Sequence, residues 1–202
     1  MASAASTRTV FALVLAAGTA SRFGATKQLA EFAGVPLVRR AIETANAVCP
    51  TRVVLVVGHE WRAVMRCCEP TQAFVVRNED YTAGIGSSLA TGIKAVRHTA
   101  DAVVVLLADQ VLIGAEHVQA LCDDWSGADD EIVATTYAGA AGAPVLFPRG
   151  CFDDLVALSG DNGGRHLLSD DRYRVREVVC EAGAIDIDTP EDLTQTLHNV
   201  RS

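Results

Sequence analysis

Short apolar runs alternate along the chain with segments in which apolar residues recur every three or four positions. The apolar runs predict strands at 10–17, 52–57, 73–76, 101–107, 132–137, 145–147 and 175–180. The helical spacing predicts helices that start at Pro36, at Ser87 or Ser88, at Gly114 and at Thr189, with shorter ones at 61–68, 151–158 and 164–169. This alternation predicts an α/β fold, a three-layer sandwich whose mostly parallel sheet carries helices on both faces.

Small or polar residues stand where four of the predicted strands end. Gly18, Gly58, Asn78 and Asp109 each follow such a strand. In mostly parallel sheets, ligands bind beyond the carboxyl ends of the strands, so we expect a binding site along this edge. The segment 139–144 is rich in glycine and alanine and is expected to be a flexible loop. No repeat or linker interrupts the pattern, and residues 10–202 are expected to form one domain behind a disordered tail at 1–9.

The loop after the first strand combines small residues with two cations. The segment 13–28 reads LVLAAGTASRFGATKQ, in which Arg22 and Lys27 follow Gly18. Small residues let backbone N–H groups approach an anion closely, and the two side chains add positive charge over the same loop. The segment has neither the Gly-Lys-Ser/Thr of a Walker A loop nor the Gly-x-Gly-x-x-Gly of a dinucleotide fingerprint. We interpret it as a polyphosphate-binding loop; the alternative is an ordinary strand followed by a flexible loop.

Three carboxylates are candidates for holding a divalent cation. Asp109 directly follows a buried strand, and an unpaired carboxylate there should face a site rather than the core. Asp186 and Asp188 stand two residues apart, which places them on the same face of a strand or strand end. Mg²⁺ prefers oxygen ligands and takes one or two carboxylates together with substrate phosphates. The alternatives are that Asp109 caps the next helix and that Asp188 is an N-cap.

The charge balance argues against two classes of partner. The 202 residues carry a formal net charge of −8 and no basic run, so nucleic acids and anionic membrane surfaces would gain few favourable contacts. No segment approaches the roughly 20 apolar residues that span a bilayer. The six cysteines lack metal-ligand spacing, and we expect free thiols in a cytoplasmic protein. A regulatory disulfide involving Cys67 and Cys68 is the alternative.

The segment 13–28 resembles the signature of the MobA-like nucleotidyltransferases, and its Lys27-Gln28 ending looks most like the molybdenum cofactor cytidylyltransferase branch. The resemblance implies Mg²⁺-dependent transfer of CMP from CTP to a phosphorylated pterin-type cofactor, with release of pyrophosphate. It further implies small-molecule substrates and, as a partner, a molybdoenzyme or its chaperone. It assigns catalysis to Arg22, Lys27 and Asp109 and the metal to Asp109 and Asp188. The nucleotide would contact Leu15, Ala16, Ala17, Gly18, Arg22, Lys27, Gly58, Asn78 and Ser88.

The acceptor half of the chain departs from the family pattern. The usual Asp-Gln-Pro reads Asp-Gln-Val, with Val111, and the usual Gly-His-Pro reads Gly-Ala-Pro, with Ala143. The segment 160–165 resembles the acceptor-side Gly-Asp-x-Gly-x-Arg loop, which adds Asp161 and Arg165 to Ala143 as acceptor-side residues. Nicotine blue oxidoreductase is similar to this family, so the alternative activity is NAD(P)H-dependent reduction of a quinone-like pigment. The base, the acceptor and the oligomeric state stay open.

Overall fold

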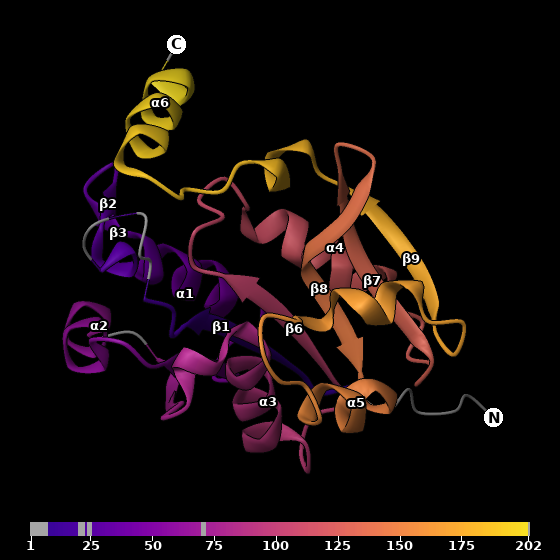
Figure 1. Ribbon diagram of the computed structural model, residues 1–202. Helices are drawn as coiled ribbons and strands as arrows, with labels where there is room; N and C mark the ends of the chain where they lie inside the picture. The colour runs from indigo at the N-terminus through magenta and orange to yellow at the C-terminus, as the bar shows by residue number, and fades with distance from the viewer. Residues whose placement is uncertain (1–7, 20–22, 24–25, 70–71, 202) are drawn as a thin grey trace.

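A seven-stranded sheet runs through the middle of the molecule, which the computed structural model describes over residues 8–19, 23, 26–69 and 72–201 (Figure 1). The strands lie in the order β5-β4-β1-β6-β8-β7-β9. Their bounds are Val10–Ala16 (β1), Val53–Val57 (β4), Phe74–Arg77 (β5), Ala102–Leu107 (β6), Glu131–Tyr137 (β7), Ala140–Pro148 (β8) and Arg174–Val179 (β9). Within this sheet only β8 runs antiparallel to its neighbours, so the predicted mostly parallel sheet is confirmed.

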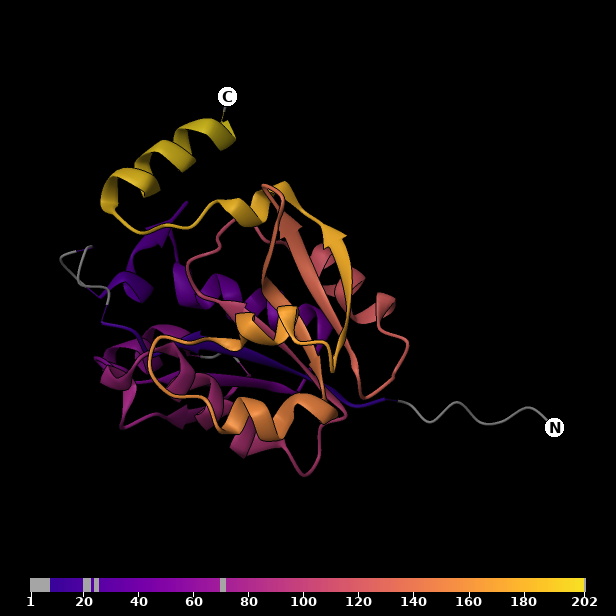
Figure 2. The ribbon, with the colours of Figure 1, turned by 45° about the vertical axis from the view of Figure 1, so that its right-hand side comes forward.

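Helices cover both faces of the sheet, which confirms the three-layer prediction (Figures 1 and 2). The helices α1 (Leu37–Val48), α2 (Trp61–Cys68) and α4 (Ala115–Asp124) pack on one face, and α3 (Ile85–Val96) and α5 (Phe152–Val156) on the other. Successive side chains of β1 point to opposite faces of the sheet. Val14 belongs to the same buried cluster as Ile42 of α1, and Leu13 belongs to the same buried cluster as Ile93 of α3. Burial on both faces explains why β1 is a continuous apolar run.

The C-terminal helix α6 (Pro190–Arg201) extends from the body of the molecule and begins with a capping box (Figures 1 and 2). The backbone N–H of Thr189 donates to Asp192 Oδ2 at 2.8 Å, and the N–H of Asp192 donates to Thr189 Oγ1 at 3.2 Å. The predicted start of this helix is therefore confirmed. Leu193 and Leu197 pack on a small apolar cluster beside the hairpin of β2 (Glu31–Phe32) and β3 (Val35–Pro36).

Short 3₁₀ turns complete the framework, at Lys27–Leu29, Tyr81–Ala83, Arg149–Cys151, Gly164–Ser169 and Glu181–Ala184. In the part of the chain that the structure describes, no helix has both the length and the apolar character needed to cross a membrane.

The segment 139–144 is not the flexible loop that its composition suggested. Its residues 140–144 form the first half of β8, which pairs with β7 through the register Tyr137↔Ala140. The two residues between these partners, Ala138 and Gly139, have φ values of 48° and 74°. Positive φ at both central positions is the geometry of the two-residue hairpin turns that match strand twist. The sequence did not predict this strand because its small residues have low β-propensity, and pairing with β7 stabilises it instead.

The predicted serine cap of α3 is also wrong. The helix begins at Ile85, with Gly84 as its N-cap, so Ser87 and Ser88 lie inside the first turn. Gly84 has a φ of 97°, a backbone conformation that favours glycine, and the helix has no side-chain cap.

Two further expectations need correction. The alternation at 185–188 suggested that Asp186 and Asp188 end a strand, but this segment is irregular. Its pattern arises because Ile187 is fully buried in the cluster that α6 covers, while Asp186 is exposed and the half-buried Asp188 accepts a hydrogen bond from Lys27. In addition, Arg8 and Thr9 of the predicted tail are held in place: Arg8 Nη1 donates to Trp125 O at 3.2 Å, and the Thr9 N–H donates to Asp101 Oδ2 at 2.9 Å. Residues 1–7 lie outside the described residues.

Candidate functional site

The carboxyl ends of four strands meet in register at one edge of the sheet. Ala16 pairs with Val57, Val57 with Arg77, and Leu15 with Leu107. The loops that follow β1, β4, β5 and β6 therefore start side by side, because parallel strands paired in register end together. These are the loops that carry Gly18, Gly58, Asn78 and Asp109, and the structure brings all four to this edge.

Backbone hydrogen bonds fix the loop that follows β1. Ala17 O accepts from the N–H of His59 at 3.1 Å, and Gly18 O accepts from Gln28 Nε2 at 2.9 Å. Lys27 and Gln28 are buried despite their polarity, with exposed fractions of 8% and 7%. The described residues 17–18 and 28 are thus held at the sheet edge, and Lys27 lines the cavity there. Arg22, the second predicted cation, lies outside the described residues.

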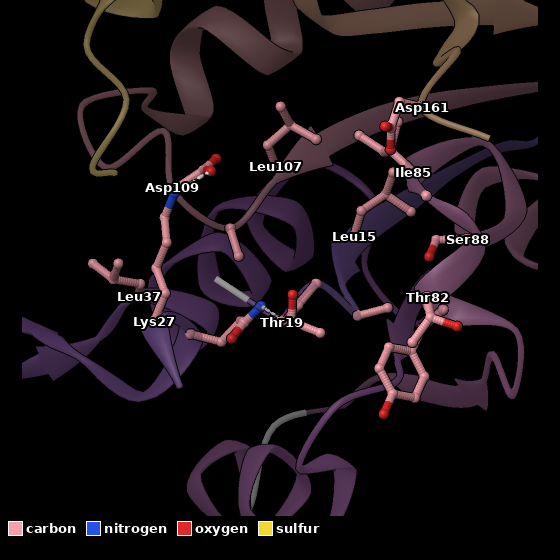
Figure 3. A pocket seen from close by; sticks show the side chains of 16 residues that line it. Leu15, Thr19, Lys27, Leu37, Thr82, Ile85, Ser88, Leu107, Asp109 and Asp161 are labelled. Atoms are coloured by element: carbon pink, nitrogen blue, oxygen red, sulfur yellow. Dashed lines mark hydrogen bonds and ion pairs between the residues drawn. The ribbon is translucent and has the colours of Figure 1, made fainter. Parts of the chain in front are cut away.

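A cavity of about 360 Å³ opens along this edge (Figure 3). Lys27 and Asp109 stand at one end of it, and Ser88, Thr82 and Asp161 stand at the other. Apolar side chains lie between the two ends, from Leu15, Leu107 and Ile85. A cavity with an apolar middle and polar groups at its ends suits a ligand with a flat organic part and a charged part.

Lys27 joins two carboxylates that are distant in sequence. Its Nζ donates to Asp109 Oδ2 at 2.7 Å and to Asp188 Oδ1 at 2.8 Å. Burial lowers the pKa of Lys27, but the charge of Asp109 and the hydrogen bonds to both carboxylates outweigh burial and raise its pKa above the ordinary value. The lysine is therefore charged at any physiological pH and balances part of the negative charge of this end of the cavity.

Neither Asp109 nor Asp188 is the N-cap of the helix that follows it, which was the alternative for each. The helix after Asp109 is capped by Gly114, and the helix after Asp188 is capped by Thr189. The backbone carbonyl of Asp109 accepts from the N–H of Ile187 at 3.1 Å. That bond ties the C-terminal segment to the end of β6 and holds both carboxylates within hydrogen-bond distance of Lys27 Nζ. Both side chains are thus placed by the fold and are available for other chemistry.

The donor atoms at this end fit a hard divalent cation. Asp109 Oδ1 is buried and has no hydrogen-bond partner among the described residues. Carboxylate oxygens are the ligands that Mg²⁺ or Mn²⁺ prefers. Burial, followed by the charges of Asp109 and Asp188, raises the pKa of Asp186, so a third carboxylate shares the same negative field. In the described chain no three His, Cys, Asp or Glu side chains converge as a complete metal cage, so a cation here would need further ligands from a substrate.

The predicted nucleotide-binding residues divide into two groups. Leu15, Ala17, Gly18, Lys27 and Ser88 line the cavity, whereas Ala16, Gly58 and Asn78 do not. Asn78 is 3% exposed, and its Nδ2 donates to the hydroxyls of Ser87 at 2.9 Å and Ser88 at 3.0 Å. The buried amide therefore holds the first turn of α3 against the end of β5 and supports the cavity wall from behind.

Gly58 is required by packing. A Cβ at this position would lie 2.5 Å from the Cβ of Tyr81 and 2.8 Å from Ala17 O. We therefore expect Gly58→Ala to lower the free energy of unfolding by about 1–3 kcal/mol, the usual cost of forcing an extra carbon into a packed region. Urea unfolding followed by circular dichroism measures the change. Gly18→Ala is the matched control, since its Cβ would meet Gln28 Nε2 at an ordinary 3.8 Å; equal losses in both variants would contradict the prediction.

The three predicted acceptor-side residues do not gather in one place. Ala143 lies in β8, where its carbonyl accepts from Gln110 Nε2 at 3.0 Å. Arg165 is exposed, and its Nε donates to Ala141 O at 3.3 Å. Asp161 instead lines the cavity on the same side as Ser88 (Figure 3). Asp161 reaches the cavity because the loop 159–163 crosses to α3, whereas Ala143 and Arg165 do not line the cavity.

Several cavity residues escaped the sequence analysis. Thr19, Tyr81, Thr82, Ile85 and Leu107 all line the cavity. Tyr81 and Thr82 lie in a 3₁₀ turn just before Gly84, and Leu107 is the last residue of a strand. Their positions at or near strand ends could have marked them as site residues. Their residue types did not, because such residues are also common in cores and turns.

Comparisons with known proteins agree with this geometry. A family model described as a MobA-like NTP transferase domain matches residues 12–177. The chain belongs to the MobA-like NTP transferase family. The purine catabolism protein PucB of Bacillus subtilis (strain 168) is 30% identical over 189 residues, covering 88% of this chain and 91% of that protein. Nicotine blue oxidoreductase of Paenarthrobacter nicotinovorans is 29% identical over 199 residues, covering 93% and 96%.

Two solved structures share the whole fold with this chain. A homologue of Mycobacterium tuberculosis Rv0371c from Mycobacterium sp. strain JC1 is 31% identical, with a TM-score of 0.84 over 96% of this chain and 98% of that one. Rv0371c of Mycobacterium tuberculosis H37Rv, solved in complex with manganese, is 27% identical, with a TM-score of 0.76 over 94% and 98%. The likeness extends over nearly the full length of each protein, so the MobA-like fold predicted from the loop signature is confirmed.

Proposed function

We propose that this protein is a Mg²⁺-dependent nucleotidyltransferase that moves CMP from CTP to a phosphorylated pterin-type cofactor and releases pyrophosphate. The observation that carries the proposal is the meeting of Lys27, Asp109 and Asp188 at one end of the cavity. A cation, two carboxylates and a loop of small residues at one strand edge are the parts that phosphoryl chemistry requires. The manganese in the Rv0371c structure supports the assignment of a divalent cation.

Each residue has a defined part in the proposed reaction. A phosphate oxygen of the acceptor attacks the α-phosphorus of CTP; the new P–O bond forms as the bond to the β-phosphate breaks, and pyrophosphate leaves. Lys27, and Arg22 with it, would hold the triphosphate and balance the charge of the leaving pyrophosphate. Asp109 and Asp188 would hold the metal, which neutralises phosphate charge when bound. The protein supplies position and charge and forms no covalent bond.

A second activity has a specific observation in its favour. Nicotine blue oxidoreductase matches this chain over nearly its whole length, and Val111 and Ala143 alter the acceptor half of the family pattern. The alternative is NAD(P)H-dependent reduction of a quinone-like pigment, with the pyrophosphate of the dinucleotide in the β1 loop. The apolar middle of the cavity, from Leu15 to Leu107, would accept a nicotinamide ring as readily as a base.

One paired assay separates the two activities. Purified protein is incubated with Mg²⁺, a pterin phosphate acceptor and each of CTP, GTP and ATP, and pyrophosphate release is measured. In parallel, NAD(P)H oxidation is followed with a quinone acceptor. We expect pyrophosphate release that is greatest with CTP and abolished by EDTA. Oxidation of NAD(P)H without pyrophosphate release would reject the transferase in favour of the reductase.

The cellular setting follows from the same proposal. A cytidylyltransferase of this kind acts on small molecules in the cytoplasm and delivers its product to a molybdoenzyme or to that enzyme's chaperone. Co-purification with a molybdenum-containing protein would support this partner.

A further inference from the structure

The far end of the cavity is closed by a loop from the C-terminal half of the chain. The loop 159–163 sits on the first turn of α3, where Gly86 N–H donates to Gly160 O at 3.0 Å. A Cβ on Gly84 would lie 2.6 Å from Asp161 Oδ1, and one on Gly86 would lie 2.7 Å from Asn162 O. Two glycines in α3 and its cap thus provide the space in which the loop docks. The position of Asp161 at the cavity wall is built into the fold.

The carboxylate of Asp161 has unused hydrogen-bonding capacity. Among the described side chains none donates a hydrogen bond to it or forms an ion pair with it, and it faces the cavity beside Ser88 and Thr82 (Figure 3). An ionised carboxylate can only accept hydrogen bonds. The residue is exposed, so water can reach this carboxylate when no ligand is bound. A ligand group that replaces this water must present N–H or O–H donors and carry no negative charge of its own.

The two ends of the cavity impose a direction on a bound nucleotide. At one end Lys27, together with a divalent cation held by Asp109 and Asp188, would attract the triphosphate, and the negative charge of Asp161 at the other end repels it. The nucleoside must then extend past Leu15 and Leu107 toward Asp161. Resting on the proposed nucleotidyltransferase function, we propose that Asp161 accepts hydrogen bonds from the nucleoside, and that it selects nucleosides that present a ribose hydroxyl or an exocyclic amino group at this end.

The two donor sources make different predictions about nucleotide choice. An amino group is present on cytosine but absent from uracil, whereas both nucleotides carry the ribose diol. Recognition of the amino group predicts that CTP binds more tightly than UTP and that 2′-deoxy-CTP binds as well as CTP. Recognition of the diol predicts equal binding of CTP and UTP and weaker binding of 2′-deoxy-CTP and 3′-deoxy-CTP.

The decisive test is the sign of the effect of Asp161→Ala on nucleotide affinity. Removing a negative charge near a polyanion should by itself tighten its binding, whereas the control Asp171→Ala, which removes an exposed carboxylate outside the cavity, should leave the affinity unchanged. If Asp161 bonds the nucleoside, Asp161→Ala should instead weaken binding of Mg²⁺–CTP by about tenfold to a hundredfold, the range for a hydrogen bond to a charged group. Isothermal titration calorimetry measures both, and thermal unfolding verifies that each variant is folded.

Inorganic tripolyphosphate separates this proposal from the one it rests on. It occupies only the Lys27 end, so its binding should be unchanged or slightly tighter in Asp161→Ala, because a repulsive charge is lost and no hydrogen bond is. Unchanged or tighter CTP binding in Asp161→Ala would overturn the role of Asp161 and leave the transferase proposal intact. Failure of the wild-type protein to bind any nucleotide would overturn both. Asp161→Asn keeps one acceptor oxygen without the charge and should fall between wild type and Asp161→Ala.

Discussion

Replacing Asp109 with asparagine is expected to reduce metal-dependent nucleotidyl transfer at least about a hundredfold, the scale on which loss of one preorganised electrostatic group acts. The amide is close in shape but carries no charge, and it presents one weak oxygen ligand in place of a carboxylate. Asp109 Oδ1 is buried and has no partner among the described residues, so a bound cation is the natural complement that the substitution removes. Initial rates of pyrophosphate release at saturating CTP, measured over a range of Mg²⁺ concentrations, give the effect.

The control for this experiment is Asp123→Asn on α4, which makes the same chemical change at an exposed site whose carboxylate contacts only Gln119 among the described side chains. Its rate should match wild type. Near-normal turnover of Asp109→Asn would remove this carboxylate from the reaction. A rate that recovers fully at high Mg²⁺ would assign it to cation affinity alone.

The strand edge of the site was predictable because local sequence determines it. The apolar run of β1, buried on both faces, must end where Gly18 interrupts it, and the run of β6 must end at Asp109. Parallel strands that end in register then bring Gly18 and Asp109 to one edge, whatever the helices do. The fold class and the position of the loop that follows β1 are therefore predictable from these few residues.

The contacts across the cavity were not predictable in the same way. Asp188 lies 161 residues from Lys27, and the packing of Ile187 under α6 and its backbone bond to Asp109 O bring it there. Asp161 reaches the cavity because Gly84 and Gly86 leave room for its loop, a fact that depends on the relative position of two distant segments. The first half of β8 was missed because pairing with β7 overrides its weak propensity. Local patterns place strand ends, and long-range packing decides which side chains meet there.

The lysine between the two carboxylates has a consequence for metal binding. Lys27 Nζ lies 2.7 Å from Asp109 Oδ2 and 2.8 Å from Asp188 Oδ1, and the lysine is 8% exposed. It therefore neutralises the same two side chains that a divalent cation would use. A cation and this ammonium group repel each other by about 4 kcal/mol at 4 Å in an effective dielectric of 20. Metal binding without nucleotide should be opposed by Lys27, and the triphosphate should draw the lysine away from the carboxylates.

Lys27→Met is accordingly expected to change two affinities in opposite directions. Binding of Mn²⁺ to the nucleotide-free protein should become at least about tenfold tighter, because a competing positive charge is gone. Binding of the triphosphate should become weaker by about 1.5–3 kcal/mol, the contribution of a hydrogen bond to a charged group. Electron paramagnetic resonance of free Mn²⁺ measures the first affinity, and calorimetry with CTP and with inorganic tripolyphosphate measures the second.

The matched control is Lys94→Met, which removes an exposed ammonium group from α3 and should leave both affinities unchanged. Stability gives a third readout: with two carboxylates left facing each other, Lys27→Met should unfold at a lower temperature than wild type, and Mn²⁺ should restore the loss. Weaker Mn²⁺ binding in Lys27→Met would mean that the lysine positions the carboxylates for the metal instead of competing with it. Unchanged tripolyphosphate binding would remove Lys27 from the phosphate end, because a lysine that holds phosphate cannot be lost without cost.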